Sequence, residues 1–315
     1  MTPKPLNYEG EPFAGPAFKT LAWIEGSLAD PSMVERLVPL FDLYVERFGE
    51  VSLYLMQGGR GKKGRPTKAT AKALAAAREW LLTPPHSFPT TLRMLTYDED
   101  QDLTIAPHFC LEEGVGMVMV EFDQGPEGPD LALADQVVEM LSVLPMICGV
   151  VGYGFYLPEN LDSLIFNLPQ TTARYRCAIE IQLSGPDGGI RKERSFFPFD
   201  RYPNVESGIA DIGWQTLIGP SFLDRIPDLG DLAEVPGVTV EKRGNTVIIK
   251  AGPAPIWGDV KRGEDISAYR EIARVLADVR YPFEVARGSL FGDAIGDAEY
   301  LDRVAAYLTR FNKEP

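Results

Sequence analysis

The sequence predicts an α+β fold, with mixed, mostly antiparallel sheets and flanking helices. Segments rich in β-branched and aromatic residues, which predict strands, are interspersed with longer segments of helical period. Three of the predicted strands, at residues 90–97, 103–112 and 116–122, follow one another with only short polar turns between them. Strands joined by such short turns run antiparallel, so we expect a meander in the first half of the chain.

The remaining elements follow along the chain. Residues 32–48 carry apolar side chains at helical spacing directly after Pro31, a residue favoured at the start of a helix. Other helices are predicted at residues 66–82, 130–144, 265–280 and 298–311, with a short one after Pro220. Further strands are predicted at residues 18–24, 51–56, 147–157, 178–183, 209–218, 238–241 and 246–251.

Three parts of the chain are expected. Residues 1–16 are rich in Pro and Gly and predict an irregular N-terminal arm. Residues 17–157 form an α+β first half, and residues 158–315 form an α+β second half. Because no low-complexity linker separates the halves, we expect them to pack as one compact unit.

The composition is that of an acidic globular protein. The chain has 315 residues, of which 45% are hydrophobic and 24% charged, and its net charge is −14. Neutralising phosphates needs an excess of Lys and Arg, so we expect no broad affinity for nucleic acid or for an anionic membrane. No signal peptide and no run of about 18 apolar residues is visible, so we expect a cytoplasmic location.

No enzyme motif is present, and we expect no catalytic residue, metal site or cofactor. His86 and His108, the two histidines, have no credible Ser or Cys nucleophile beside them in the sequence. The basic, glycine-rich loop from Gly58 to Arg65 lies between a predicted strand and a predicted helix, a setting in which backbone amides can hold an anion. An anion site and an exposed loop both remain open for this segment.

The second half carries a more specific series of motifs. They are Arg201-Tyr-Pro-Asn204, Asp211-Ile-Gly-Trp-Gln-Thr-Leu-Ile-Gly219, Val247-Ile-Ile-Lys-Ala-Gly-Pro-Ala-Pro255, Gly258-Asp-Val-Lys-Arg-Gly-Glu-Asp265 and Ser267-Ala-Tyr-Arg-Glu-Ile-Ala-Arg274. This series resembles the type VI secretion immunity family of TsiV-like proteins, most clearly over residues 200–282. The segment Gly213-Trp-Gln-Thr216 departs from the Asn-Trp-Leu-Thr that family members often carry, which leaves the identity of the toxin open.

The resemblance implies an immunity protein that is not an enzyme. Such a protein neutralises a cognate toxin, in some relatives a VRR-Nuc nuclease, by direct binding and occlusion of the toxin's active site. Its partner would be the toxin, and the resemblance leaves the oligomeric state open. We expect the motif residues to serve the fold rather than the interface: Trp214, Gly258, Asp259, Arg262, Tyr269 and Arg270.

A long acidic stretch suggests a surface for this partner. Between Arg93 and Arg174 there is no Lys or Arg, whereas fourteen Asp and Glu residues lie there. Carboxylates on the meander could occupy a toxin cleft that is built to attract phosphates. The residues assigned to this partner-binding role are Glu99, Asp100, Glu112, Glu113, Glu121 and Asp123. The alternative is that these acids only solvate an exposed face.

Two other functions stay open from the sequence. The chain could be an enzyme with a dispersed phosphate- or nucleotide-binding site, assembled around the loop from Gly58 to Arg65. It could also be a chaperone that loads a secreted effector. Calorimetry with nucleotides and divalent metals would test the first alternative. Rescue of toxin-expressing cells that lack the secretion machinery would test the second.

Overall fold

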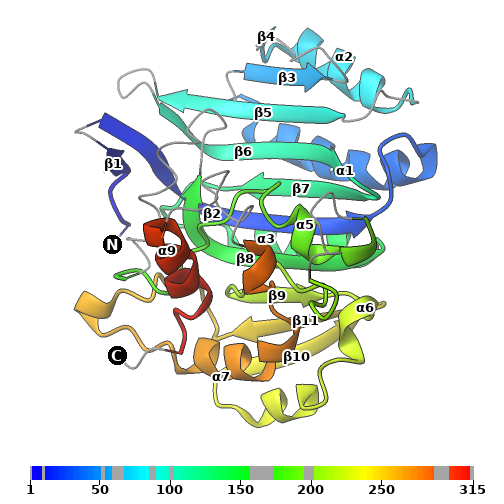
Figure 1. Cartoon of the computed structure of the whole chain (residues 1–315). Helices are drawn as coiled ribbons and strands as arrows, with labels where there is room; N and C mark the ends of the chain where they lie inside the picture. The colour runs from blue at the N-terminus through cyan, green and yellow to red at the C-terminus, as the bar shows by residue number, and fades with distance from the viewer. Residues whose placement is uncertain are drawn as a thin grey trace.

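One large sheet organises the fold (Figure 1). The structure is a computed structural model, and it describes residues 2–8, 11–50, 54–58, 67–84, 90–98, 103–156, 173–194, 202–286 and 298–312. Within these ranges, eleven strands form a sheet in the order β10-β11-β9-β8-β2-β7-β6-β5-β3-β4, with β1 paired to β2. The strand pairs are antiparallel and helices accompany the sheet, so the predicted α+β class is confirmed.

The elements have the following bounds. The strands are β1 (Leu6–Tyr8), β2 (Glu11–Glu25), β3 (Tyr54–Gly58), β4 (Thr67–Lys68), β5 (Thr91–Asp98), β6 (Leu103–Gly114), β7 (Met117–Asp123), β8 (Met146–Tyr156), β9 (Gln215–Ile218), β10 (Val238–Arg243) and β11 (Thr246–Ala251). The α-helices are α1 (Pro31–Phe48), α2 (Ala71–Leu81), α3 (Leu131–Ser142), α5 (Asp187–Ile190), α6 (Pro220–Leu223), α7 (Ser267–Val275), α8 (Phe283–Ala286) and α9 (Ala298–Leu308). Short 3-10 helices include η4 (Leu229–Glu234) and η5 (Val260–Arg262).

The predicted meander is confirmed as β5, β6 and β7. Each strand pairs antiparallel with the next, and the register places Phe109 of β6 opposite Phe122 of β7. Because side chains alternate along a strand, Phe109, Leu111 and Glu113 lie on one face, whereas His108, Cys110 and Glu112 lie on the other. This alternation decides where the acids of the meander point.

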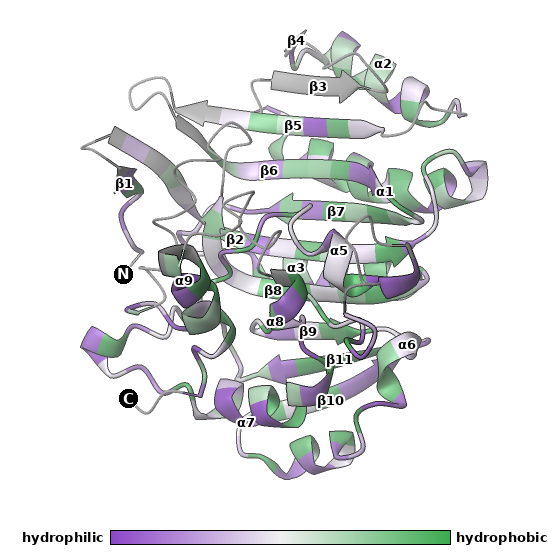
Figure 2. Ribbon diagram, viewed as in Figure 1, coloured by the Kyte–Doolittle hydropathy of each residue, from purple (hydrophilic) through white to green (hydrophobic). Residues whose placement is uncertain are grey.

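Helix α1 covers the first of these faces. Asp30 caps its N-terminus by accepting a hydrogen bond from the Ser32 backbone N–H at 2.9 Å. Tyr44 packs against Phe109 and Phe122, with ring centroids 5.3 Å apart in both pairs. Figure 1 shows α1 and α3 behind the sheet and α5 and α9 in front of it. The sheet is therefore flanked on both sides, and Figure 2 shows its central strands largely in the colours of apolar residues.

The N-terminal arm is a correction to the prediction for residues 1–16. Instead of an irregular segment, residues 6–8 form β1, and β2 begins at Glu11. The local Pro and Gly signal is overridden by pairing, since Gly15 and Pro16 lie opposite Tyr156 and Phe155 of the long strand β8. Strand β2 consequently sits between β7 and β8 at the centre of the sheet.

Two other predicted strands differ from the structure. Over residues 178–183 the described backbone makes only an isolated bridge, between Ile179 and Gly154, and over residues 209–218 the strand is limited to β9. Glu99, Asp100 and most of the loop from Gly58 to Arg65 lie outside the described residues. None of the described helices is long and apolar enough to cross a membrane.

A buried ion network joins α9 and the turn after it to the rest of the second half. Arg310 donates to Asp211 at 2.8 Å, and both side chains are almost completely buried. Tyr307 donates to the other oxygen of Asp211 and accepts a hydrogen bond from the Glu180 backbone N–H at 3.0 Å. Arg280 completes the group with a nitrogen 3.7 Å from Asp211. Asp211 opens one of the sequence motifs, so this motif anchors the C-terminal helix.

Candidate functional site

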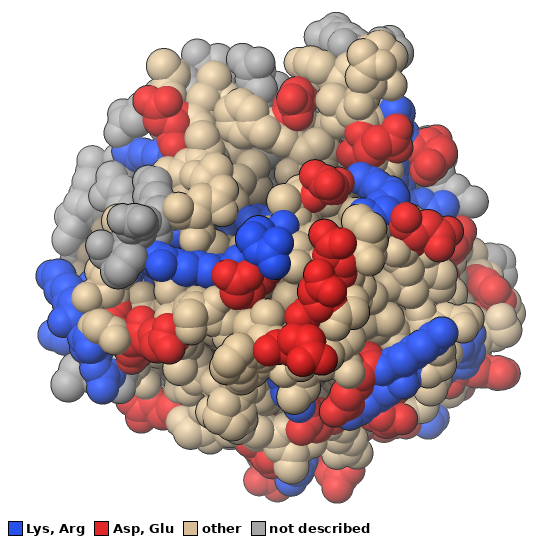
Figure 3. All heavy atoms as spheres, turned by 90° about the horizontal axis from the view of Figure 1, so that it is seen from below, with Lys and Arg blue, Asp and Glu red and all other residues tan. Residues whose placement is uncertain are grey.

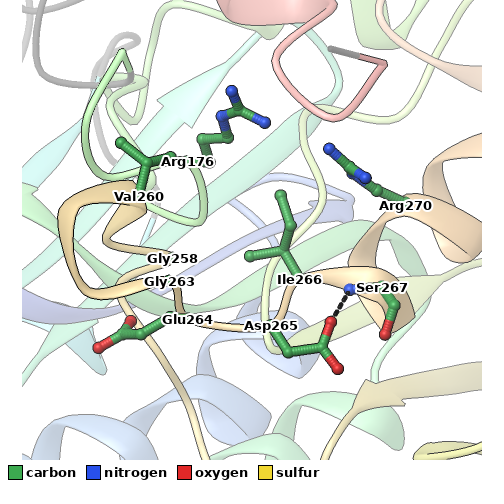
Figure 4. A pocket seen from close by; sticks show the side chains of 9 residues that line it. All are labelled: Arg176, Gly258, Val260, Gly263, Glu264, Asp265, Ile266, Ser267 and Arg270. Atoms are coloured by element: carbon green, nitrogen blue, oxygen red, sulfur yellow. Dashed lines mark hydrogen bonds between the residues drawn. The ribbon is translucent and has the colours of Figure 1, made fainter. Parts of the chain in front are cut away.

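A surface pocket lies between the Gly258–Asp265 motif and the start of α7 (Figure 4). Its volume is about 300 Å³. Figure 4 shows Arg176 and Arg270 extending from opposite walls, with Ile266 between them. At its floor, Asp265 accepts a hydrogen bond from the Ser267 backbone N–H at 2.9 Å, which fixes the first turn of α7. The pocket is therefore a preformed hollow with one guanidinium on each side.

Gly258 and Asp259 shape the loop beside the pocket. Gly258 has a φ of +66°, and a Cβ there would lie 2.7 Å from Cys177 Sγ, so only glycine fits without strain. Asp259 caps η5 by accepting a hydrogen bond from the Lys261 N–H at 3.0 Å. The Arg174 guanidinium, 2.9 Å away, holds the pKa of Asp259 below its ordinary value. Both residues thus position the pocket without facing into it as ligand groups.

Aromatic packing attaches this loop to the sheet. Trp257 stacks on Tyr153 of β8 with ring centroids 4.7 Å apart and planes within 13°. Tyr175 and Phe155 pack against the same indole at 5.7 and 5.5 Å. Trp257 therefore anchors the loop to the sheet. The sequence alone assigned it no role, because it lies between two motifs rather than within one. Arg176 was also missed, because it lies 82 positions before Gly258 in the chain and reaches the pocket only through folding.

The other motif residues occupy varied environments. Trp214 is buried, and its indole N–H donates to the Gly252 carbonyl at 3.0 Å. Tyr269 is buried on α7 and stacks with Phe311, ring centroids 5.9 Å apart. Arg262 is exposed beside Glu264 at 3.6 Å, and Arg270 lines the pocket. Four of the six thus lie inside the protein, while the two arginines reach its surface.

A second group of charged side chains lies buried in the first half of the chain. It comprises Lys19 of β2, His108 of β6, and Glu121 and Asp123 of β7, and we call it the buried polar cluster. Lys19 Nζ lies 3.2 Å from Glu121 Oε1, and His108 Nδ1 lies 3.4 Å from Glu121 Oε2. Tyr156 packs on the His108 ring at 4.5 Å between centroids. These residues share the face of the sheet opposite α1.

Burial and close charges shift the protonation of the cluster. Burial alone raises the pKa of Glu121, but Lys19 and His108 outweigh it and hold that pKa well below its usual range. Burial, reinforced by the negative charge of Glu121, raises the pKa of Asp123 well above its ordinary value. Burial also lowers the pKa of His108, although the negative charge of Glu121 acts in the opposite direction and raises it. Glu121 is thus the more acidic carboxyl of the pair, and burial disfavours the charged form of His108.

The four predicted partner-binding acids that the structure describes do not form a common surface. Glu121 and Asp123 are 5% and 0% exposed, so the expectation that they present carboxylates to a partner is wrong. Glu113 is buried on the α1 side, where it accepts hydrogen bonds from the Ser27 hydroxyl and the Leu28 N–H. Glu112 is half-buried and paired with Arg93 at 2.6 Å. The physical reason is that both faces of the sheet are covered at β6 and β7, so Glu113 on one face and Glu121 and Asp123 on the other are enclosed.

A comparison with known protein families finds a match in the second half of the chain. Residues 200–311 match the TsiV family model, described as type VI immunity for VRR-NUC. We call residues 200–311 the TsiV region, after the family model that they match. The resemblance read from the motifs is thereby confirmed, and the match contains the Gly258–Asp265 motif, α7 and both members of the Asp211–Arg310 pair.

The fold of the whole chain is also that of a solved structure. A Pseudomonas aeruginosa T6SS protein, PA0821, superposes with a TM-score of 0.73 at 16% sequence identity, covering 98% of this chain and 87% of that one. At this identity the likeness establishes a shared fold. No curated protein sequence matches the chain.

The TsiV region also carries exposed acids. Between α6 and the end of η4, four carboxylate side chains are exposed: Asp224, Asp228, Asp231 and Glu234. Arg274 of α7 lies close enough for Asp228 and Asp231 to raise its pKa, after the larger effect of its partner Glu271. Figure 3 views the lower end of the molecule and shows Asp and Glu side chains near the middle of this face, with Lys and Arg on either side. Because they are exposed, Asp224, Asp228, Asp231 and Glu234 can meet a partner, unlike the acids of the buried polar cluster.

Proposed function

We propose that the protein neutralises a cognate type VI secretion toxin by binding it directly and occluding its active site. The observation that carries this proposal is the match of residues 200–311 to a family described as type VI immunity for VRR-NUC. The fold shared with a T6SS protein over 98% of the chain supports the same context. The protein would act by binding rather than by catalysis, in the compartment where a nuclease toxin meets DNA, the cytoplasm.

Charge supports a nuclease as the partner. A nuclease cleft attracts phosphates with positive charge, and the present chain has a net charge of −14. Within the TsiV region, Asp224, Asp228, Asp231 and Glu234 form a run of exposed carboxylates between α6 and the end of η4 that such a cleft could meet. Complementary charge of this kind accelerates encounter and enforces specificity more than it adds affinity. We therefore assign the electrostatic part of toxin recognition to this segment.

The pocket beside α7 supplies the other part of the interface. Tight protein complexes depend on a few side chains that fill well-packed pockets on the partner. A hollow of about 300 Å³ accommodates one large side chain of the toxin, and Arg176 and Arg270 could hold a carboxylate or carbonyl beside it. We therefore infer that the pocket receives an anchor residue of the toxin.

A charge-neutralising variant tests the electrostatic part. Asp224, Asp228, Asp231 and Glu234 would be changed together to Asn or Gln, and association with the purified toxin measured by biolayer interferometry at several salt concentrations. The expected result is an association rate about tenfold lower at low salt, with a weaker salt dependence. A matched control changes four exposed acids outside the TsiV region: Glu35, Glu46, Glu79 and Glu127. Equal rates for the two variants would contradict the assignment.

A filling substitution tests the pocket. Ser267→Trp places an indole at the rim and should raise the dissociation rate by at least about tenfold, because the anchor residue is displaced. Ser32→Trp is the matched control. Ser32 and Ser267 each lie two residues after an Asp whose side chain accepts a hydrogen bond of 2.9 Å from their backbone N–H. Unchanged dissociation from the Ser267→Trp variant would overturn the pocket's role.

A cell-based experiment tests the function itself. Co-expression of the chain with the toxin alone, in cells without secretion machinery, should restore growth. Failure to restore growth despite stable binding would instead identify an effector-loading chaperone. Growth restored by a chain that does not bind the toxin would contradict neutralisation by occlusion.

A further inference from the structure

The buried polar cluster contains three side chains with metal-binding chemistry. His108, Glu121 and Asp123 each offer one ligand atom, and these atoms lie within 4.8 Å of one another. His108 of β6 pairs directly with Asp123 of β7, and Glu121 precedes Asp123 by two residues on the same face. The rigid register of two central strands therefore holds a nitrogen and two carboxylate oxygens around one point.

The spacing between His108 and Glu121 suits two ligands of one ion. His108 Nδ1 and Glu121 Oε2 are 3.4 Å apart, beyond the range of about 2.7–3.2 Å for N–H···O hydrogen bonds. Two ligand atoms at about 2.0–2.1 Å from a tetrahedral ion are separated by roughly 3.4 Å. The observed distance therefore matches the edge of a coordination tetrahedron and is longer than a usual hydrogen bond.

Several polar atoms in the cluster lack a conventional partner. Within the described part of the chain, neither ring nitrogen of His108 and neither carboxylate oxygen of Asp123 makes a hydrogen bond of good geometry, although all four atoms are buried. Buried polar groups are nearly always hydrogen-bonded or bound to a metal. One ligand atom each of His108, Glu121 and Asp123 lies within 4.8 Å of the others, so an ion bound there could satisfy an unpartnered atom of His108 and one of Asp123.

Lys19 orients the cluster without blocking it. Its ammonium contacts Glu121 Oε1 at 3.2 Å and donates to the Phe155 carbonyl at 3.1 Å, which leaves Oε2 directed toward His108. A ligating carboxylate is commonly held by such an outer partner. The nearby Arg93 is already paired with Glu112. Lys19 is thus one cation beside two carboxylates, and a bound cation, a protonated His108 or a proton on Asp123 would each balance the second negative charge.

We propose that His108, Glu121 and Asp123 bind one divalent transition-metal ion, with a nitrogen and oxygen ligand set suited to Zn²⁺. The sequence contains no metal-binding motif, so this site was not predicted from it. It is independent of toxin neutralisation, since it lies outside the TsiV region. The rival occupant is a proton shared by Asp123 and Glu121.

An isosteric substitution separates the two occupants. The full-length, tag-free protein would be stripped of metal and titrated with Zn²⁺ in competition with a chromophoric chelator. We expect one equivalent bound, and at least about tenfold weaker binding by Asp123→Asn, whose amide mimics a protonated acid. Glu113→Gln, which changes a buried carboxylate on the opposite face of β6, should bind as the unmodified chain does. No uptake of Zn²⁺, or equal uptake by Asp123→Asn, would overturn the proposal.

The two histidines of the chain provide a second readout. Long-range ¹H–¹⁵N spectra of the imidazole rings contain signals from His86 and His108 only, and His86→Gln assigns them. Zn²⁺ should shift the His108 signals and leave those of His86 unchanged. If Zn²⁺ bound instead at one of the buried thiols, Cys110, Cys148 or Cys177, the His108 signals would not move as expected for a ligand, and the assignment would be wrong.

Discussion

The acids of the meander and the acids of the TsiV region belong to the same residue types but occupy opposite environments. Glu121 and Asp123 lie at 5% and 0% exposure within a sheet that is covered on both faces. Asp228 and Asp231 are exposed on and beside the short helix η4. The density of acids along the sequence is higher in the meander, yet its described strand acids are buried or half-buried, whereas Asp228 and Asp231 are exposed. Coverage of the backbone, rather than the number of charges, decides which acids face the solvent.

The two regions also differ in what their charges require. A buried carboxylate must be paired, protonated or bound to a metal, because its desolvation is otherwise too unfavourable. An exposed carboxylate is stabilised by water and needs no partner. Substitutions should consequently change the free energy of unfolding strongly in the first region and weakly in the second.

The largest effect is expected from Lys19→Met. The substitution leaves Glu121 buried without its closest cation, so the free energy of unfolding should fall by about 3–5 kcal/mol. Urea denaturation at neutral pH measures this change. The double variant Lys19→Met, Glu121→Gln removes both charges and should recover part of the loss. Strictly additive effects of the two substitutions would show that the pair does not interact.

A smaller effect is expected at Asp259, which is buried but pairs with a half-exposed arginine. Asp259→Asn keeps an acceptor for the Lys261 N–H, whereas Asp259→Ala removes it. The alanine variant should therefore be less stable than the asparagine variant by about 1 kcal/mol, the usual contribution of a cap. Thermal unfolding of both variants checks this difference. Equal stabilities would mean that the cap contributes nothing.

A pH-dependent effect is expected at Asp187, which lies between the two extremes of exposure. Burial, followed by the nearby Glu112, raises the pKa of Asp187 to about 6. The folded protein then holds this proton more tightly than the unfolded chain, so stability should decline as the pH rises from about 4 to about 6. Asp187→Asn should flatten the stability profile in that window. An unchanged slope would contradict the raised pKa.

The smallest effect on stability is expected from Asp228→Asn and Asp231→Asn. Both side chains are exposed, so each substitution should change the free energy of unfolding by less than about 0.5 kcal/mol. Urea denaturation of the single variants measures this. A larger loss would show that these acids serve the fold and would weaken their assignment to the interface.

The sequence predicted the fold best where local pattern and tertiary environment agree. Helix α1 and the meander have a clear period, and both formed close to the expected bounds. The beginning of β2 was misjudged because Pro12 and Pro16 signal an irregular chain, whereas pairing with β8 imposes a strand. Local propensity is a weak guide wherever a long neighbouring strand offers a partner.

The candidate sites were harder to predict because they are assembled across the chain. Lys19, His108 and Glu121 come from three strands, and only the register of the sheet brings them together. The acids of the meander were expected to lie on an exposed face, but acids on a strand face the solvent only where one face of the sheet is open to water. The motif residues around Gly258 were visible in the sequence, whereas Arg176 became part of the pocket only through the fold.

The Asp211–Arg310 pair has a consequence for the order in which the protein is completed. Asp211 and Arg310 are separated by 99 residues, so the carboxylate lacks its nearest cation until the last turn beyond α9 is in place, and before then only Arg280, 3.7 Å away, can pair with it. The strands that contain the buried polar cluster have all been synthesised long before that point. On the ribosome, the first half of the sheet can begin to assemble before α9 of the TsiV region has been synthesised. A nascent chain arrested before Arg310 would therefore leave the buried Asp211 carboxylate with the more distant Arg280 and without its 2.8 Å contact to Arg310.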